Sequence, residues 1–196
     1  WLNLCSHGLW NVAIASFFVL GPVIAQRRLG GAGSWGLVAS GLSAGYIAGG
    51  MVALRIKPRR PLVWANLALT LTVAQLLGLA VPLPAPWLAA LGALGFCGVA
   101  FLNAVWASVV QQRIPRETLS RVSAYDWLIS LVAMPAGYAL AGPLSARLGT
   151  ATTLVGASLF VLLPSLATAL TPAIRRVRYV EADEAGPLIE APTVGE

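Results

Sequence analysis

The sequence predicts an all-α membrane protein with six transmembrane helices, and three observations lead to this prediction. Hydrophobic residues make up 58% of the 196 residues and charged residues only 10%, whereas about a quarter of a soluble domain is charged. The mean hydropathy is +0.78. Long apolar segments alternate with short basic clusters, as in the loops of membrane proteins. So little polar surface could not cover a soluble fold, and we expect the lipid bilayer to be the main solvent.

Six segments have the roughly 20 apolar residues that a membrane-crossing helix needs. Turn and charge signals separate them: "RRLGGAGS" follows the first segment, "RIKPRRP" the second, "PLPAP" the third, "RIPRETLSR" the fourth and "ARLG" the fifth. Because these connections are short, consecutive helices should pack antiparallel. The predicted spans are residues 1–25, 34–54, 62–82, 86–111, 121–146 and 150–173.

Basic residues predict the orientation of the six spans. Six spans place both ends of the bundle on one side, and ten of the thirteen basic residues fall on that side. They are Arg55, Lys57, Arg59, Arg60, Arg113, Arg116, Arg121, Arg175, Arg176 and Arg178. The other side has Arg27, Arg28 and Arg147. By the positive-inside rule the chain is expected in the cytoplasmic membrane with both termini cytoplasmic.

The chain divides into two predicted regions. Residues 1–174 form the six-helix bundle, and residues 175–196 are polar, acidic at the end and contain Pro and Gly, which predicts a cytoplasmic, mostly disordered tail. Although the net charge is +6, the basic residues form no continuous face, so a nucleic-acid partner is not expected.

Two polar patterns inside the spans are candidates for a substrate cavity. In the first span Asn3, His7 and Asn11 recur every four residues and share a helix face. Phe96, Asn103 and Trp106 follow one face of the fourth span. Polar groups in such helices should face protein or water. Hydrogen bonding between helices and lining of a cavity both explain the patterns at this point.

Small residues predict close helix packing. Gly41, Gly45 and Gly49 form a doubled small-xxx-small pattern, which lets another backbone approach closely. The fifth span contributes three further packing candidates: Gly137, Gly142 and Pro143. Tight static packing and helix sliding during gating are both consistent with this pattern.

Enzyme chemistry finds little support. No metal-ligand spacing or nucleotide motif occurs, and Cys5 and Cys97 lie inside apolar segments, so we expect no metal, no cofactor and no enzymatic activity. "GLSAG" has the spelling of a serine-hydrolase motif around Ser43, but that motif requires a strand-to-helix turn. An intramembrane protease with His7 as base is therefore a weak alternative.

Two acidic residues stand apart from the others. Five of the seven acids lie in the last sixteen positions, while Glu117 and Asp126 lie in "RIPRETLSRVSAYDW". With the fifth helix starting near residue 120 or 121, Asp126 lies about 8–9 Å inside it and needs a partner. One hypothesis is a gating ion pair with the basic loop; the alternative is a local helix-start charge. The basic gating candidates are Arg55, Arg59 and Arg60.

Residues 111–149, "QQRIPRETLSRVSAYDWLISLVAMPAGYALAGPLSARLG", resemble the tenth-to-eleventh helix region of major facilitator superfamily permeases, in the branch of drug and siderophore exporters similar to the enterobactin exporter. "GGMVALRIKPRRPL" resembles a short basic cytoplasmic loop of that branch, although Leu54 stands where the superfamily's loop motif has an Asp. The resemblance covers residues 1–175 and maps onto the second half of a twelve-helix protein.

The resemblance implies a fold and a function. The six helices would form two inverted three-helix repeats, joined to an N-terminal six-helix half that this sequence lacks. A small-molecule substrate would bind near mid-membrane between the halves, and rocking of the halves, coupled to protons, would export it. The expected function is therefore the C-terminal half of a secondary active exporter of small amphiphilic compounds. A non-transporting six-helix membrane sensor or assembly protein is the alternative.

Overall fold

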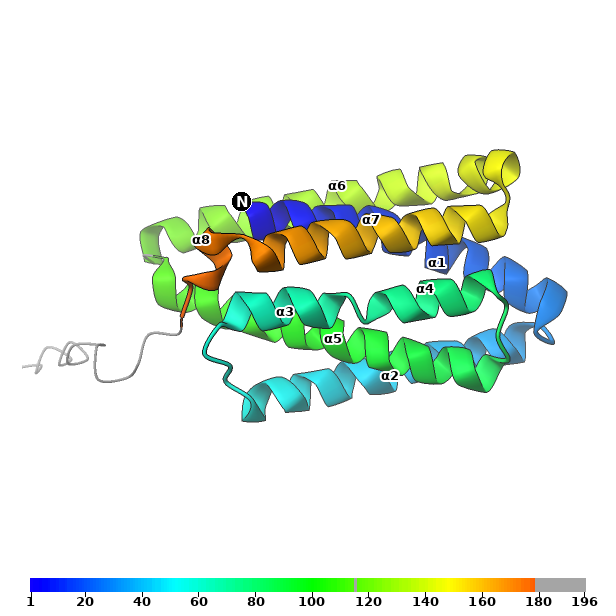
Figure 1. The fold of residues 1–196 in the computed structure, drawn as a ribbon, viewed down its shortest axis with the longest axis horizontal. Coiled ribbons are helices and arrows are strands. Elements are labelled where there is room, and N and C mark those ends of the chain that lie inside the picture. The colour runs from blue at the N-terminus through cyan, green and yellow to red at the C-terminus, as the bar shows by residue number, and fades with distance from the viewer. Residues whose placement is uncertain (115, 179–196) are drawn as a thin grey trace, which may run out of the picture.

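The computed structural model describes residues 1–114 and 116–178, and within them every regular element is a helix (Figure 1). The helices are α1 (Leu2–Arg28), α2 (Ala32–Arg55), α3 (Pro61–Leu69), α4 (Thr72–Ala80), α5 (Ala85–Arg113), α6 (Arg116–Leu148), α7 (Thr150–Leu170) and α8 (Pro172–Arg175). Six helical stretches are long and apolar enough to cross a membrane, with α3 and α4 together forming the third. The prediction of an all-α protein with six such stretches is confirmed.

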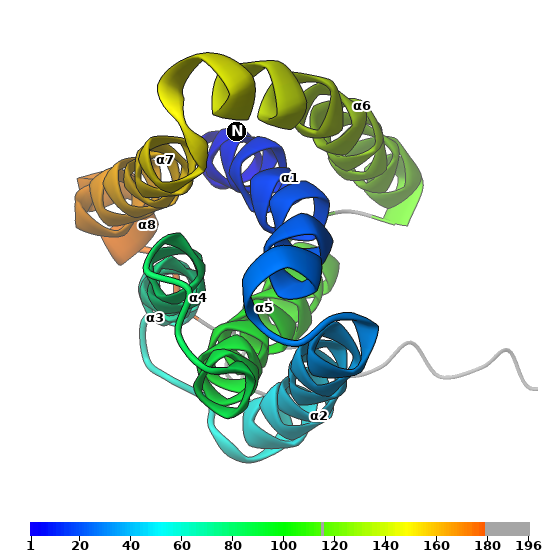
Figure 2. The same cartoon turned by 90° about the vertical axis from the view of Figure 1, so that its right-hand side faces the viewer.

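The long helices form one antiparallel bundle with α1 and α5 near its middle (Figures 1 and 2). Helix α2 packs along α5 and α6 packs along α1, while α3, α4 and α7 lie on the other side of these two helices (Figure 2). Side chains from α1, α3, α4, α5 and α7 fill the core, among them Phe17, Leu69, Leu76, Leu102 and Leu154.

Glycines set the distance between α2 and α5. A Cβ atom added at Gly41, Gly45 or Gly49 would overlap the main chain of α5, at Ala89, Ala93 and Cys97 respectively. The three glycines therefore form an edge on which the α5 backbone rests directly. The same kind of contact joins α6 to α1, because a Cβ at Gly137 would overlap the backbone of Val12.

The other two packing candidates of the fifth span behave differently. A Cβ added at Gly142 would meet nothing within 4 Å, so the predicted packing at Gly142 is not found among the described residues. Pro143 is exposed and lies within the continuous helix α6. Both residues are exposed on the outer side of α6. The glycine-proline pattern alone could not tell which side of the helix they would be on.

The third span is interrupted at Thr70 and Leu71, which the sequence analysis did not predict. The backbone tightens there: the N–H groups of Thr70 and Leu71 donate to carbonyls only three residues earlier. The hydroxyls of Thr70 and Thr72 also donate to carbonyls three residues back, a local bond that competes with helical geometry. On α5, Gly98 lies against the carbonyl of Ala68, next to this break.

The bundle differs from its predicted limits at two places. Helix α6 begins at Arg116 instead of residue 121. After α7, Ile174 is buried, Val177 packs on the core, and the guanidinium of Arg113 donates to the carbonyl of Arg178. Residues 175–178 of the predicted tail therefore pack against the bundle. Its remainder, residues 179–196, lies outside the described residues.

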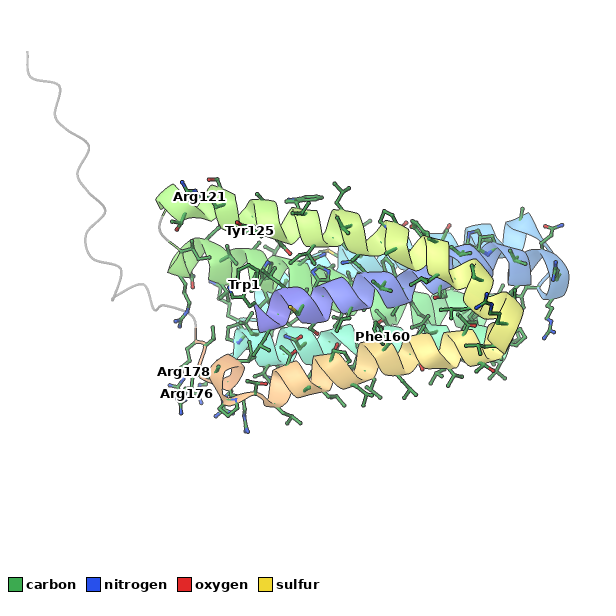
Figure 3. All side chains as sticks on the ribbon, turned by 90° about the horizontal axis from the view of Figure 1, so that it is seen from above. Trp1, Arg121, Tyr125, Phe160, Arg176 and Arg178 are labelled. Carbon is green, nitrogen blue, oxygen red and sulfur yellow. The ribbon has the colours of Figure 1, made fainter. Side chains whose placement is uncertain are left out.

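The two ends of the bundle carry very different numbers of basic residues. The chain start, the loop between α2 and α3, and the segment between α5 and α6 lie at one end, together with α8 (Figures 1 and 3). Arg121, Arg176 and Arg178 are at that end with Trp1 (Figure 3). Ten of the thirteen basic residues belong to this end, which we call the basic end.

Cysteine labelling tests whether the basic end and the opposite end lie on different sides of a membrane. In a variant with Cys5 and Cys97 replaced by alanine, a cysteine at Arg59 and one at Gly31 should react with an impermeant maleimide from opposite sides. The positive-inside rule predicts cytoplasmic reaction at position 59 and reaction from outside at position 31. Labelling of both positions from the same side would contradict six crossings.

Candidate functional site

Three candidate residues from three different helices lie towards the basic end of the bundle. The indole Nε1 of Trp106 on α5 donates a hydrogen bond of 3.0 Å to Oδ2 of Asp126 on α6. His7 on α1 interacts electrostatically with the Asp126 carboxylate. We call His7, Trp106 and Asp126 the polar cluster. All three side chains are half-buried, so protein contacts hold them while part of each remains accessible.

The surroundings of His7 connect α1 to α6. The imidazole lies beside the Trp10 ring, with 5.5 Å between ring centroids. Asn11 donates to the carbonyl of His7 at 3.1 Å and makes a long 3.5 Å contact with the hydroxyl of Ser130 on α6. Asn11 is thus a buried link between helices, whereas His7 is half-buried.

Asn3 faces a different neighbour. The side-chain amide of Asn66 on α3 donates to Oδ1 of Asn3 at 2.8 Å, and Asn3 is only 4% exposed. Asn3 thus joins α1 to α3 by a hydrogen bond between helices, and its place in a substrate cavity stays a prediction. A four-residue step turns about 40° past a full helical turn, so Asn3 and Asn11 are about 80° apart around α1.

The α5 candidates lie on the side of the bundle shared with α1 and α2. The Asn103 amide donates to the hydroxyl of Tyr46 on α2 at 3.2 Å. Phe96 meets Phe18 of α1 edge to face, with 6.1 Å between ring centroids. Phe96 and Asn103 are half-buried, like Trp106. The predicted face of α5 thus borders α1 and α2, and it presents two aromatic rings and an amide.

Sequence reasoning missed Tyr46 and Ser130, the partners of Asn103 and Asn11. Both carry a hydroxyl inside a predicted span, and such a group requires a hydrogen-bond partner. That signal could have found them as candidates. It could not have paired them, because the partners are 57 and 119 residues away in the sequence.

The basic loop does not provide the partner of Asp126. Arg55, Arg59 and Arg60 are exposed at the end of the bundle, and among the described residues none forms an ion pair with Asp126. Since α6 begins at Arg116, Asp126 is about 15 Å along the helix from its first residue. The apolar stretch of this helix begins at Ser123, three residues before Asp126, and the Trp106 indole, not the loop, meets the carboxylate.

Two cavities of the structure lie away from the polar cluster. One of about 420 Å³ is at the end opposite the basic end, between the last turns of α1 and the connection from α6 to α7. A smaller cavity of about 240 Å³ lies between α1, α6 and α7. The residues of the polar cluster instead come from α1, α5 and α6, which lie with α2 on one side of the bundle (Figure 2). We call this side, where α2 and α6 are the least buried of the long helices, the open side.

The Ser43 hydroxyl donates to the carbonyl of Ala39 within α2, at 3.2 Å, so the "GLSAG" segment is helical. Among residues 1–114 and 116–178 no three His, Cys, Asp or Glu side chains are grouped to hold a metal ion. The polar cluster itself consists of one carboxylate, one imidazole and one indole.

No family model matches the chain, and neither curated proteins nor solved structures contain a match.

Proposed function

We propose that this chain is the C-terminal half of a secondary active exporter of small amphiphilic compounds. The observation that carries the proposal is the polar cluster, in which the Trp106 indole of α5 donates to the Asp126 carboxylate of α6 and His7 of α1 interacts with that carboxylate electrostatically. A carboxylate inside a membrane-spanning helix is costly and marks a functional position.

The pairing of helices supports an architecture of two interlocked three-helix repeats. In this proposal α1, α2 and α3–α4 form one repeat, and α5, α6 and α7 form the other. The second helix of each repeat then packs on the first helix of the other, since α2 lies along α5 and α6 along α1. The two third members, α3–α4 and α7, pack together, as a two-fold relation between the repeats requires.

The exposed side of the bundle supports a second six-helix half as partner. Only 22% of the apolar window of α2 and 11% of that of α6 are buried, against 67% in α1. Lipid could cover their apolar side chains, but it could not solvate Asp126 or the Asn103–Tyr46 pair. A second half across this side would enclose these groups around a substrate and, by rocking, open them to either face of the membrane.

The chemistry of the open side supports an amphiphilic substrate, cationic or neutral, because one carboxylate stands among aromatic rings. Proton exchange is the proposed driving force. We place the transporter in the cytoplasmic membrane with the basic end inside.

Transport by the chain joined to its N-terminal half tests the proposal. In inside-out vesicles acidified inside, ethidium should accumulate, and collapse of the proton gradient should abolish the accumulation. His7→Gln should change the apparent affinity for ethidium relative to an uncharged amphiphile while accumulation still depends on the gradient. The reason is that the variant alters a side chain of the polar cluster and leaves Asp126 charged.

Ser43→Ala is the matched control, since Ser43 is exposed and bonded within its own helix, and it should transport like the unaltered protein. If His7→Gln had the same apparent affinity for ethidium, and the same preference between ethidium and the uncharged amphiphile, His7 would not belong to the substrate site. Absence of gradient-driven movement of any tested amphiphile in the unaltered protein would contradict export.

A further inference from the structure

A second charged surface lies at the basic end, on the side away from the polar cluster. Helix α8 packs against the start of α3, and buried Ile174 anchors it to the core. This contact brings Arg175 and Arg176 near the segment that leads into α3. The exposed side chains of this surface are Arg59, Arg60, Trp64, Arg175 and Arg176. We call them the α3–α8 surface.

The arginines of the α3–α8 surface have no carboxylate partner in the described part of the chain. Asp126 is the one acidic residue whose side chain the structure describes, and it is bonded to Trp106. The same end carries further exposed basic side chains, including Arg178 beside α8 (Figure 3). An anionic ligand bound at this surface would relieve the repulsion among these charges.

The height of the α3–α8 surface is that of lipid headgroups. Arg60 immediately precedes the apolar span that begins with α3. Arg175 is the last residue of α8, which follows the apolar span of α7. Trp64 is in the first turn of α3, about 4–5 Å along the axis from Pro61, and is 57% exposed. Indole rings at this level are typical of the membrane–water boundary.

The position around the bundle also favours lipid. Helices α3, α7 and α8 are on the side opposite α6 and α2 (Figure 2). In the proposed transporter this side faces the bilayer, not the second half. Two arginines from α8 and two from the approach to α3 could donate paired N–H groups to phosphate oxygens, and the Trp64 ring could lie against the upper acyl chain.

We propose that the α3–α8 surface is a binding site for an anionic phospholipid of the leaflet at the basic end. The headgroup phosphate and its neighbouring anionic groups are held by Arg59, Arg60, Arg175 and Arg176, and Trp64 contacts the glycerol region. The site rests on the proposed placement of the bundle in a bilayer, and it shares no residue with the polar cluster.

Lipid binding to the purified full chain in neutral detergent micelles tests the site. Phosphatidylglycerol added to the micelles should bind and raise the unfolding temperature, whereas phosphatidylcholine and inorganic phosphate should not. In the double variant Arg175→Gln/Arg176→Gln, the apparent affinity for phosphatidylglycerol should fall by about 25-fold. This factor corresponds to a loss of about 1 kcal/mol of binding free energy for each arginine removed.

The matched control is Arg27→Gln/Arg28→Gln, which removes two exposed arginines at the other end of the bundle and should bind phosphatidylglycerol like the unaltered chain. Trp64→Leu should weaken lipid binding while every arginine remains. Each variant is first compared with the unaltered chain by gel filtration and circular dichroism.

If the two double arginine variants lost the same affinity for phosphatidylglycerol, binding would depend only on the net charge of the protein. That result would overturn the site. Stabilisation by inorganic phosphate to the same extent would identify a free-anion site instead of a lipid site. If both arginine variants bind phosphatidylglycerol unchanged, the α3–α8 surface holds no lipid.

Discussion

Gly45→Ala should lower the free energy of unfolding by about 1–3 kcal/mol, the usual cost of overpacking a well-packed interior. The new Cβ would overlap the carbonyl group of Ala93 on α5. A backbone group cannot rotate away as a side chain can, so α2 and α5 would have to separate along the whole glycine edge. Alanine's better helix propensity, about 0.5–1 kcal/mol, would offset only part of this cost.

The comparison that makes the result specific is Gly36→Ala in the same helix. A Cβ at Gly36 would meet nothing within 4 Å, so this variant should be as stable as the unaltered chain or slightly more stable. Unfolding in mixed micelles of increasing dodecyl sulfate content, followed by circular dichroism, measures both variants. Equal stability of Gly45→Ala and Gly36→Ala would show that the glycine edge does not carry the contact between α2 and α5.

Asp126→Asn should reduce transport about tenfold or more while the protein folds normally. The asparagine carbonyl can still accept the hydrogen bond from Nε1 of Trp106, so the contact between α5 and α6 is kept. What is lost is the charge, which makes a hydrogen bond about twice as strong and which interacts with His7. We expect the variant to favour the inward-open state, because α5 and α6 are then less firmly held together near the basic end.

Accessibility and transport are measured together for this prediction. Ser108 is exposed on α5, two residues beyond Trp106, and a cysteine there should react faster from the basic end in Asp126→Asn. Trp106→Phe should have a similar effect, and the double variant should be no worse than either, because paired residues act as a unit. Arg55→Gln, at the exposed end of α2, should transport normally.

Two results would contradict a gating role for Asp126. Normal transport together with unchanged labelling at position 108 would reduce the carboxylate to a local charge of α6. Additive losses in the double variant would indicate that Asp126 and Trp106 act separately, and the hydrogen bond between them would then have no part in gating.

Close helix contacts could be located from the sequence better than polar ones. Gly41, Gly45 and Gly49 repeat every four residues, so any partner helix must meet all three on one face, and α5 does. Asn3 shows why the polar pattern was less informative. Its spacing with His7 placed it on a similar face, but the helix next to that part of α1 is α3, and Asn66 satisfies its side chain.

The interruption of the third span had only weak local signals. Threonines at 70 and 72 can bond back to the preceding turn, yet most threonines in helices do not break them. Here Gly98 leaves space for the carbonyl of Ala68, and Trp10 donates to the Thr72 hydroxyl at 3.1 Å. Both contacts come from other helices, so the break depends on groups that the local sequence does not contain.

The sequence by itself determined the six apolar helices, their short connections and the unequal charge of the two ends, because hydropathy and charge act locally along the chain. Only the tertiary structure decided which side chains meet. It gave Asp126 the indole of Trp106 in place of the loop arginines, and it turned Asn3 towards α3 while His7 stayed near the carboxylate. The physical reason is that a polar group in an apolar bundle bonds to whichever partner packing brings within about 3 Å, and packing depends on all the helices together.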